Sequence, residues 1–145
     1  MPTTDPRRPL RRPAGARDVA DAVPSPGRGF GLGLITAVLL GAILAILGGP
    51  VSLSAGLAVV AFFLGRLVGT MVRVGAAGTL SSPARVSLAI ALSLAGVALG
   101  QLGIWVFARS EGGTLDLGAY LFDAFGPLVP LEFMIATLSA WWSAR

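Results

Sequence analysis

Carboxylates are the side chains of this chain best suited to acid–base chemistry. After residue 28 they occur at four positions: Glu111, Asp116, Asp123 and Glu132. The first three lie in a loop segment that offers neither a nucleophile nor a metal partner to complete a catalytic constellation. The chain has no cysteine and no histidine, which excludes a thiol nucleophile, a structural zinc site and a Ser-His-Asp relay. The sequence therefore predicts no catalytic residue, no metal site and no cofactor.

Polar residues inside apolar segments are the other candidates for function, because such groups are costly in a membrane and often mark a site. Four of them stand out: Thr36, Arg66, Gln101 and Glu132. At about 1.5 Å per helical residue, Gln101 shares the depth of Glu132, whereas Thr36 shares the depth of Arg66, about 13 Å away. Arg109 ends the segment that contains Gln101 and is a second group that could extend toward Glu132.

Two interpretations of these residues remain open. In the first, Glu132 is a hydrogen-bonded or protonated carboxyl at a helix contact, and Arg66 extends its guanidinium to the lipid headgroups. In the second, Glu132 binds a proton or a cation with Gln101 as its partner. The solvent accessibility of Glu132 distinguishes them, because a proton or cation site must be reachable from water.

The elements that hold these residues are predicted to be apolar helices. Of the 145 residues, 54% are hydrophobic and 12% are charged, against about a quarter charged in a soluble domain. Four apolar segments match or approach the length that crosses a hydrocarbon core of about 30 Å: residues 30–48, 52–72, 86–108 and 127–142. Residues 117–124 predict a short interfacial helix. The predicted fold is all-α, a polytopic membrane protein with four transmembrane helices within residues 29–145.

Residues 1–28 differ from the rest of the chain in composition. They contain six prolines, six arginines and three aspartates, and too few large apolar side chains to offset the entropy cost of ordering. We expect a disordered tail whose arginines attract anionic lipid at a bilayer surface. The tail lacks the interleaved aromatic residues of a nucleic-acid-binding segment, so nucleic acid is not an expected partner.

The positions of the arginines predict the orientation of the chain. Arg73, Arg85 and Arg145 fall on the same side of the membrane as the tail, and Arg109 alone falls on the other side. Cytoplasmic segments carry an excess of Arg and Lys. We therefore expect a multi-pass protein of the inner (plasma) membrane with both termini in the cytoplasm.

Small residues recur at four-residue spacing within the first three apolar segments. Such stripes let helix backbones approach closely, which matters because lipid provides no hydrophobic force between helices. The positions expected at helix contacts are Gly33, Gly41, Gly65, Gly69, Gly96 and Gly100. These contacts are either within the chain or with another subunit, a second copy or a different membrane protein.

Several short motifs resemble those of a known group of proteins. They are the run Gly-Arg-Leu-Val-Gly-Thr-Met-Val-Arg at 65–73, the pair Gly100-Gln101 with Trp105, and the close Ala-Trp-Trp-Ser-Ala-Arg at 140–145. With them the chain resembles small four-helix bacterial membrane proteins of unknown function, a resemblance that implies a membrane domain and no activity. We expect a non-enzymatic accessory or scaffold subunit. The alternative is an oligomeric proton- or ion-coupled transporter or channel that uses Glu132 and Gln101.

Overall fold

The computed structural model describes residues 23–51, 54–113 and 115–145, and this part of the chain is helical with no strand. The helices are α1 (Pro26–Gly48), α2 (Ser54–Gly75), α3 (Ser82–Ser110), α4 (Leu117–Phe125) and α5 (Leu128–Ala144). The all-helical prediction is thereby confirmed for the described residues. Most of the predicted tail, residues 1–22, lies outside them.

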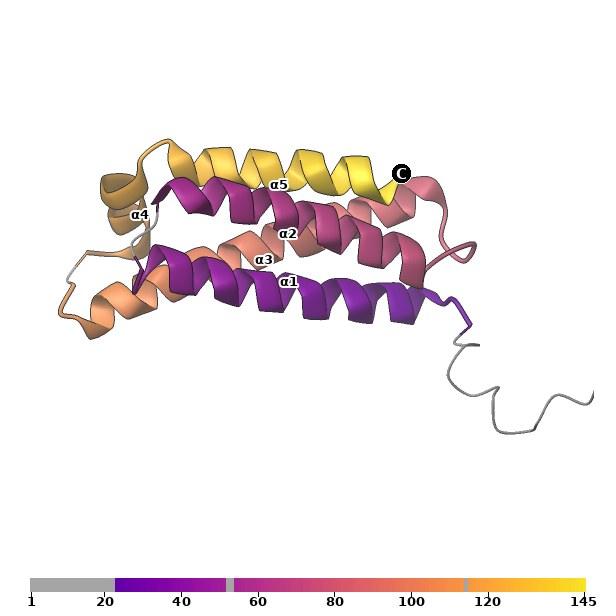
Figure 1. The fold of residues 1–145 in the computed structure, drawn as a ribbon, viewed down its shortest axis with the longest axis horizontal. Coiled ribbons are helices and arrows are strands. Elements are labelled where there is room, and N and C mark those ends of the chain that lie inside the picture. Colours follow the sequence, from indigo (N-terminus) through magenta and orange to yellow (C-terminus); the bar gives the residue numbers. More distant parts are fainter. Residues whose placement is uncertain (1–22, 52–53, 114) are drawn as a thin grey trace, which may run out of the picture.

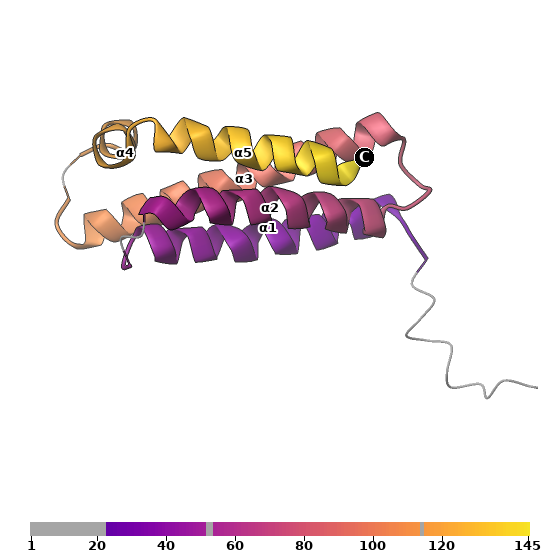
Figure 2. The same ribbon diagram turned by 45° about the horizontal axis from the view of Figure 1, so that its top comes forward.

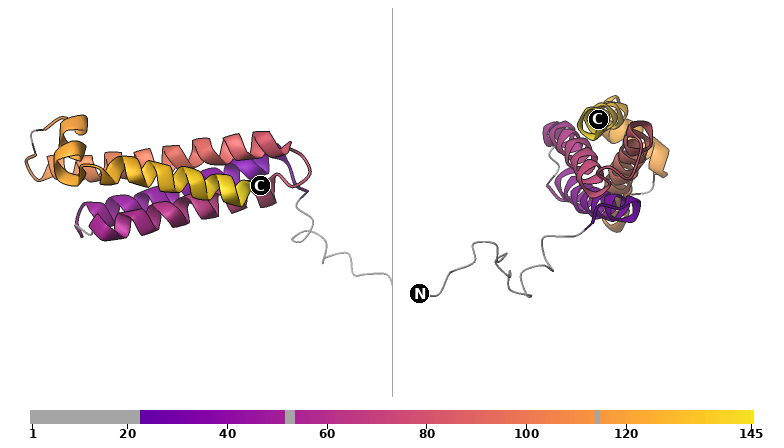
Figure 3. Two further views of the ribbon diagram at one scale, coloured as in Figure 1. Left: turned by 90° about the horizontal axis from the view of Figure 1, so that it is seen from above. Right: turned by 90° about the vertical axis from the view of Figure 1, so that its right-hand side faces the viewer.

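Four long helices form an elongated bundle, and α4 lies at one end of it (Figure 1, Figure 2). Around the bundle the order is α1, α2, α5, α3, and α2 also contacts α3 across the centre. Because α4 turns the chain back between α3 and α5, α2 and α5 run in the same direction, as do α1 and α3 (Figure 3). We call the end that holds α4 the α4 end, and the opposite end, where α1 begins and α5 terminates, the C-terminal end.

Two of the helices begin earlier than the apolar pattern predicted, because capping and proline positions determine where they start. Helix α1 begins at Pro26, where the Ser25 side chain accepts a hydrogen bond from the Arg28 backbone N–H at 3.1 Å. Helix α3 begins at Ser82 with Pro83 in its first turn, a position that needs no intrahelical donor. Residues 26–28, predicted as part of the tail, and residues 82–85, which precede the third predicted span, are therefore helical.

The break between α4 and α5 divides the last apolar segment. The Asp116 side chain accepts a hydrogen bond from the Ala119 backbone N–H at 2.9 Å and so caps α4. Gly126, at φ +51, ends that helix, and α5 then continues at an angle of 91° to it. The short helix predicted at 117–124 and the last span predicted at 127–142 correspond to α4 and α5 within two residues.

The bundle is apolar on both its inside and its outside. Its interior contains small and branched aliphatic residues such as Ala61, Val68 and Ala136, all fully buried. Its outward faces carry residues such as Leu39 and Leu138, each 60% exposed, where a soluble bundle would carry polar side chains. Helices α1, α2 and α3 are long and apolar enough to cross a membrane, and α4 with α5 pass the same test as a bent pair.

Candidate functional site

A buried polar pair lies inside the bundle between α3 and α5. The Gln101 Nε2 group donates a hydrogen bond to Glu132 Oε2 at 2.5 Å. Glu132 is 0% exposed and Gln101 is 3% exposed, so neither side chain reaches the surface of the chain. The two residues are 31 positions apart in the sequence, and their hydrogen bond joins two antiparallel helices.

Helix periodicity explains why both side chains point inward. On α3, Gln101 shares its buried face with Val97 and Ile104, one turn to either side. On α5, Glu132 lies one turn before the buried Ala136. The sequence predicted a common depth for Gln101 and Glu132. The antiparallel arrangement of α3 and α5 brings the two side chains at that depth into contact.

The α4 end of the bundle is closed over the pair by aromatic and aliphatic side chains. Tyr120 and Phe125 of α4 pack with Leu128 against a buried cluster of Leu44, Leu57 and Ile104. The two aromatic rings contact each other edge to face, with 6.4 Å between their centroids. Because Ile104 lies one turn beyond Gln101 on α3, this cluster lies on the α4 side of the polar pair.

Each member of the pair keeps one buried oxygen without a hydrogen-bond partner among the described residues: Gln101 Oε1 and Glu132 Oε1. A neutral carboxyl and an amide can exchange two hydrogen bonds, because the acid O–H donates to the amide oxygen while the amide N–H donates to the acid. A carboxyl enclosed in apolar surroundings is less costly in that neutral form. The pair can therefore hold a proton, and it holds α3 against α5.

Serine side chains on α5 form part of the interior that sequence reasoning missed. Ser139 donates to the Ile135 carbonyl at 2.8 Å, and Ser143 donates to the Ser139 carbonyl at 2.7 Å. Both are buried and satisfy their own hydroxyls, so they behave as small packing residues. Ser139 and Ser143 are four residues apart, as are Ala136 and Ala140. This spacing of small residues is the pattern that identified the glycines of the first three segments.

The remaining polar candidates do not join the pair. The Thr36 hydroxyl donates to the Leu32 carbonyl of its own helix at 2.8 Å. Arg66 is exposed on the outer side of the bundle, between α2 and α5. Arg109 does not extend to Glu132, because its guanidinium lies over the ring of Trp105 at 5.1 Å from the centroid, at the α4 end.

All six glycines singled out in the sequence lie at contacts between helices. A Cβ on Gly41 would lie 2.6 Å from the Gly96 carbonyl, and one on Gly69 would lie 2.7 Å from the Ala140 carbonyl. A Cβ on Gly65 would overlap the Ala136 carbonyl. Gly33 faces Leu92 and Val72, and Gly100 faces Leu44. These close approaches are internal to the chain, along the parallel pairs α1–α3 and α2–α5 and at the α1–α2 contact.

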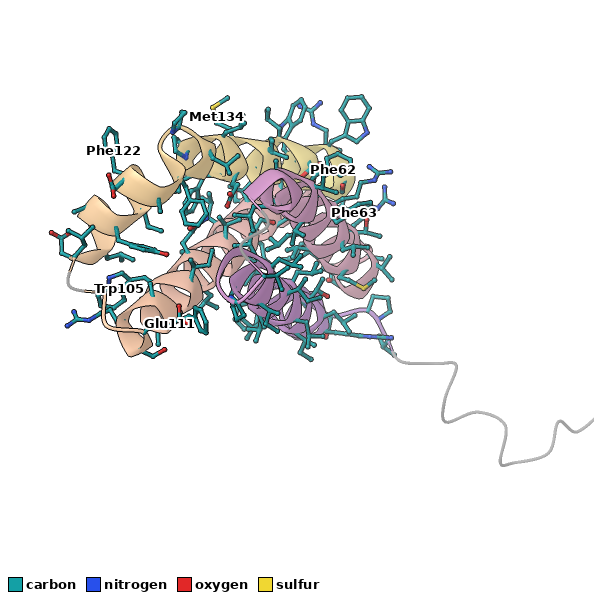
Figure 4. The ribbon with its side chains drawn as sticks, turned by 60° about the vertical axis from the view of Figure 1, so that its left-hand side comes forward. Phe62, Phe63, Trp105, Glu111, Phe122 and Met134 are labelled. Carbon is teal, nitrogen blue, oxygen red and sulfur yellow. The ribbon has the colours of Figure 1, made fainter. Side chains whose placement is uncertain are left out.

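The outward side chains are mainly hydrophobic. Figure 4 shows Met134 of α5 and Phe122 of α4 pointing away from the bundle, and these residues are 59% and 79% exposed. Within the described residues, no three His, Cys, Asp or Glu side chains gather in a way that could hold a metal ion. No protein family, no curated protein and no solved structure matches this chain.

Proposed function

We propose that this chain is a small non-enzymatic integral membrane protein that crosses the bilayer four times and serves as an accessory or scaffold subunit. In this arrangement α1, α2, α3 and α5 are the spans, and α4 lies along the membrane surface. Helix α5 has 17 residues, about 25 Å of helix, which is shorter than the hydrocarbon core, so the bilayer thins slightly around it. The bent α4–α5 pair supports this assignment, since α4 has nine residues and is too short to cross the bilayer.

The charges at the two ends support an orientation with both termini in the cytoplasm of a bacterial cell. The described part of the C-terminal end carries Arg28, Arg73, Arg85 and Arg145 and no acidic side chain. The α4 end carries Arg109 with Glu111, Asp116 and Asp123. The positive-inside bias places the arginine-rich end at the cytoplasmic face of the inner membrane. The arginines of residues 1–22 then lie beside anionic lipid headgroups.

One observation carries the proposal for a scaffold: Glu132, the single carboxyl at membrane depth among the described residues, is 0% exposed and hydrogen-bonded to Gln101. A transport site must exchange its ion or proton with water on at least one side. A sealed carboxyl between α3 and α5 serves instead to fix the positions of two helices. The outer faces of the helices take no part in this polar contact. They are available for contact with lipid, with a second copy, or with another membrane protein.

The alternative is an oligomeric proton- or ion-coupled transporter or channel centred on the same pair. The unpartnered Gln101 Oε1 and Glu132 Oε1 favour it, because buried polar atoms without partners are places where a proton, a water or an ion can be held. Four closely packed helices leave little room for a path within one chain. This function therefore requires contacts between copies that open a route to Glu132.

Ion flux in proteoliposomes tests the two functions against each other. Wild-type protein and Glu132→Gln are reconstituted at matched density, and proton flux is followed after a pH jump and a potassium diffusion potential. A scaffold gives the same leak as protein-free vesicles for both proteins. Flux above that leak, abolished in Glu132→Gln, would establish the transporter and reject the scaffold, because an amide cannot titrate.

A further inference from the structure

A groove runs along the outside of the bundle between α2 and α5. It has a volume of about 550 Å³, within the range of small-molecule sites. Its walls are Phe62 and Arg66 from α2, and Ile135, Leu138, Ser139 and Trp142 from α5. The groove is mainly apolar, with the Arg66 guanidinium as its one charged group, and it does not include the buried pair of Gln101 and Glu132.

The groove exists because two helices with small residues at their contact carry large residues beside it. Gly65 and Gly69 bring the α2 backbone onto the backbone of α5. The neighbouring large side chains then diverge on the outer surface and leave a furrow between them. Phe62 is 44% exposed and Trp142 is 72% exposed, so both walls are accessible from outside the bundle.

Arg66 is a cation without a counter-ion in the described part of the chain, where no carboxylate forms an ion pair with it. A lone guanidinium facing hydrocarbon is costly, and an anion that shares the site offsets that cost. Arginine presents a planar set of donors that fits phosphate oxygens in pairs. The groove thus combines an apolar channel with one donor group suited to phosphate.

The Arg66 side chain is within reach of the headgroup region of the cytoplasmic leaflet. Gly65 faces Ala136 and Ser139, and Gly69 faces Ala140 and Ser143, which sets the register of the two parallel helices. In that register Arg66 lies about one helical turn, roughly 6 Å, deeper than Trp142. A tryptophan near the end of a span marks the membrane interface, and an arginine side chain is long enough to bridge one turn.

We propose that this groove binds an anionic phospholipid of the cytoplasmic leaflet. Its phosphate pairs with the Arg66 guanidinium, its glycerol region lies beside Trp142, and one acyl chain follows Phe62, Ile135 and Leu138. The inference requires the chain to be membrane-inserted, and it holds whether the protein is a scaffold or a transporter.

A lipid fits this groove better than a second copy of the chain or free phosphate. A second copy would have to offer an acid at this depth, and Glu132 is the one carboxyl of the described helices that lies in a span, where it is buried. Inorganic phosphate has no apolar part to fill the channel. An anionic phospholipid supplies both the charge and the hydrocarbon.

Native mass spectrometry of the full chain tests this assignment. Delipidated protein in mild detergent receives equal amounts of phosphatidylglycerol and phosphatidylethanolamine, and bound lipid is counted for wild type, Arg66→Gln and Arg73→Gln. Arg73 is an exposed arginine on the same helix that does not line the groove, so it controls for general surface charge. The N-terminal arginines are present in all three proteins and contribute equally.

The wild type should prefer phosphatidylglycerol, and Arg66→Gln should weaken its binding about tenfold or more, as expected for loss of a charge-assisted contact. Arg73→Gln should weaken it less than twofold. Leu138→Trp, which fills the groove and keeps the charge, should also weaken it, while millimolar inorganic phosphate should not displace it. Equal losses from Arg66→Gln and Arg73→Gln, no preference over phosphatidylethanolamine, or loss of a dimer in place of a lipid would each reject the proposal.

Discussion

At the scale of single residues, the stability of the bundle depends on the hydrogen bonding of one buried carboxyl. Glu132 has one hydrogen bond from Gln101 and no counter-ion among the described residues. Removing one member of such a pair leaves a desolvated polar group, whereas changing the acid to an amide keeps the shape and the acceptor. The two members of the pair should therefore differ in what their substitution costs.

We predict that Gln101→Leu lowers the free energy of unfolding by about 1–3 kcal/mol, because Glu132 then loses its only partner. Glu132→Gln should change it by less than about 1 kcal/mol, since an amide is easier to bury than a charge. SDS titration of the protein in mild detergent, followed by circular dichroism, measures both. The reverse order, with Glu132→Gln more damaging than Gln101→Leu, would indicate that the carboxyl itself is required for stability.

At the scale of helices, small residues set which elements touch. The parallel pairs α1–α3 and α2–α5 meet where glycine permits backbone contact, at Gly41 with Gly96 and at Gly65 with Ala136. Gly31, in contrast, has open space where its Cβ would be. The same substitution should therefore destabilise the bundle at Gly65 and not at Gly31.

We predict that Gly65→Ala destabilises the bundle by about 1–3 kcal/mol, because even one methyl group overlaps the Ala136 carbonyl and forces α2 away from α5. Gly31→Ala should be neutral or stabilising by up to about 1 kcal/mol, as expected when alanine replaces glycine in a helix. Thermal unfolding in detergent compares the two variants. If both behave alike, the α2–α5 contact does not depend on the absence of a side chain.

Much of the helical architecture could be predicted from the sequence, because the first three apolar runs are long and each is followed by a glycine, a proline or an arginine. Equal depths for Gln101 and Glu132 also follow from counting residues along two helices. Which helices are neighbours could not be predicted, since lipid favours no particular pairing and the contacts depend on three-dimensional fit. For that reason the sequence assigned Thr36 a common depth with Arg66 but could not show that Arg66 faces the α2–α5 groove.

At the scale of the whole molecule, the two ends of an otherwise apolar bundle differ in charge. The described part of the C-terminal end has arginines and no acidic side chain, and the α4 end has three of the four acidic side chains that follow residue 28. This asymmetry, together with the apolar outer faces, favours insertion in one orientation. The chain contains no cysteine, so single introduced thiols can report that orientation without background.

We predict that Ser82→Cys is protected from an impermeant thiol reagent in intact cells, while Ser110→Cys is labelled. Both residues are exposed and lie at opposite ends of α3, so one helix supplies the test and its control. Permeabilised cells should label both. Labelling of Ser82→Cys with protection of Ser110→Cys would reverse the orientation and place the arginine-rich end outside.

We propose that the polar pair between α3 and α5 is inaccessible to water and holds the two helices together. Thiol accessibility tests this most directly. Glu132→Cys in proteoliposomes is treated with a small water-soluble methanethiosulfonate, with Ser110→Cys as the accessible reference. Glu132→Cys should remain unlabelled while the protein is folded and should react fully once SDS unfolds it. Labelling of folded Glu132→Cys at a rate near that of Ser110→Cys would reveal a water path to the site and contradict the account.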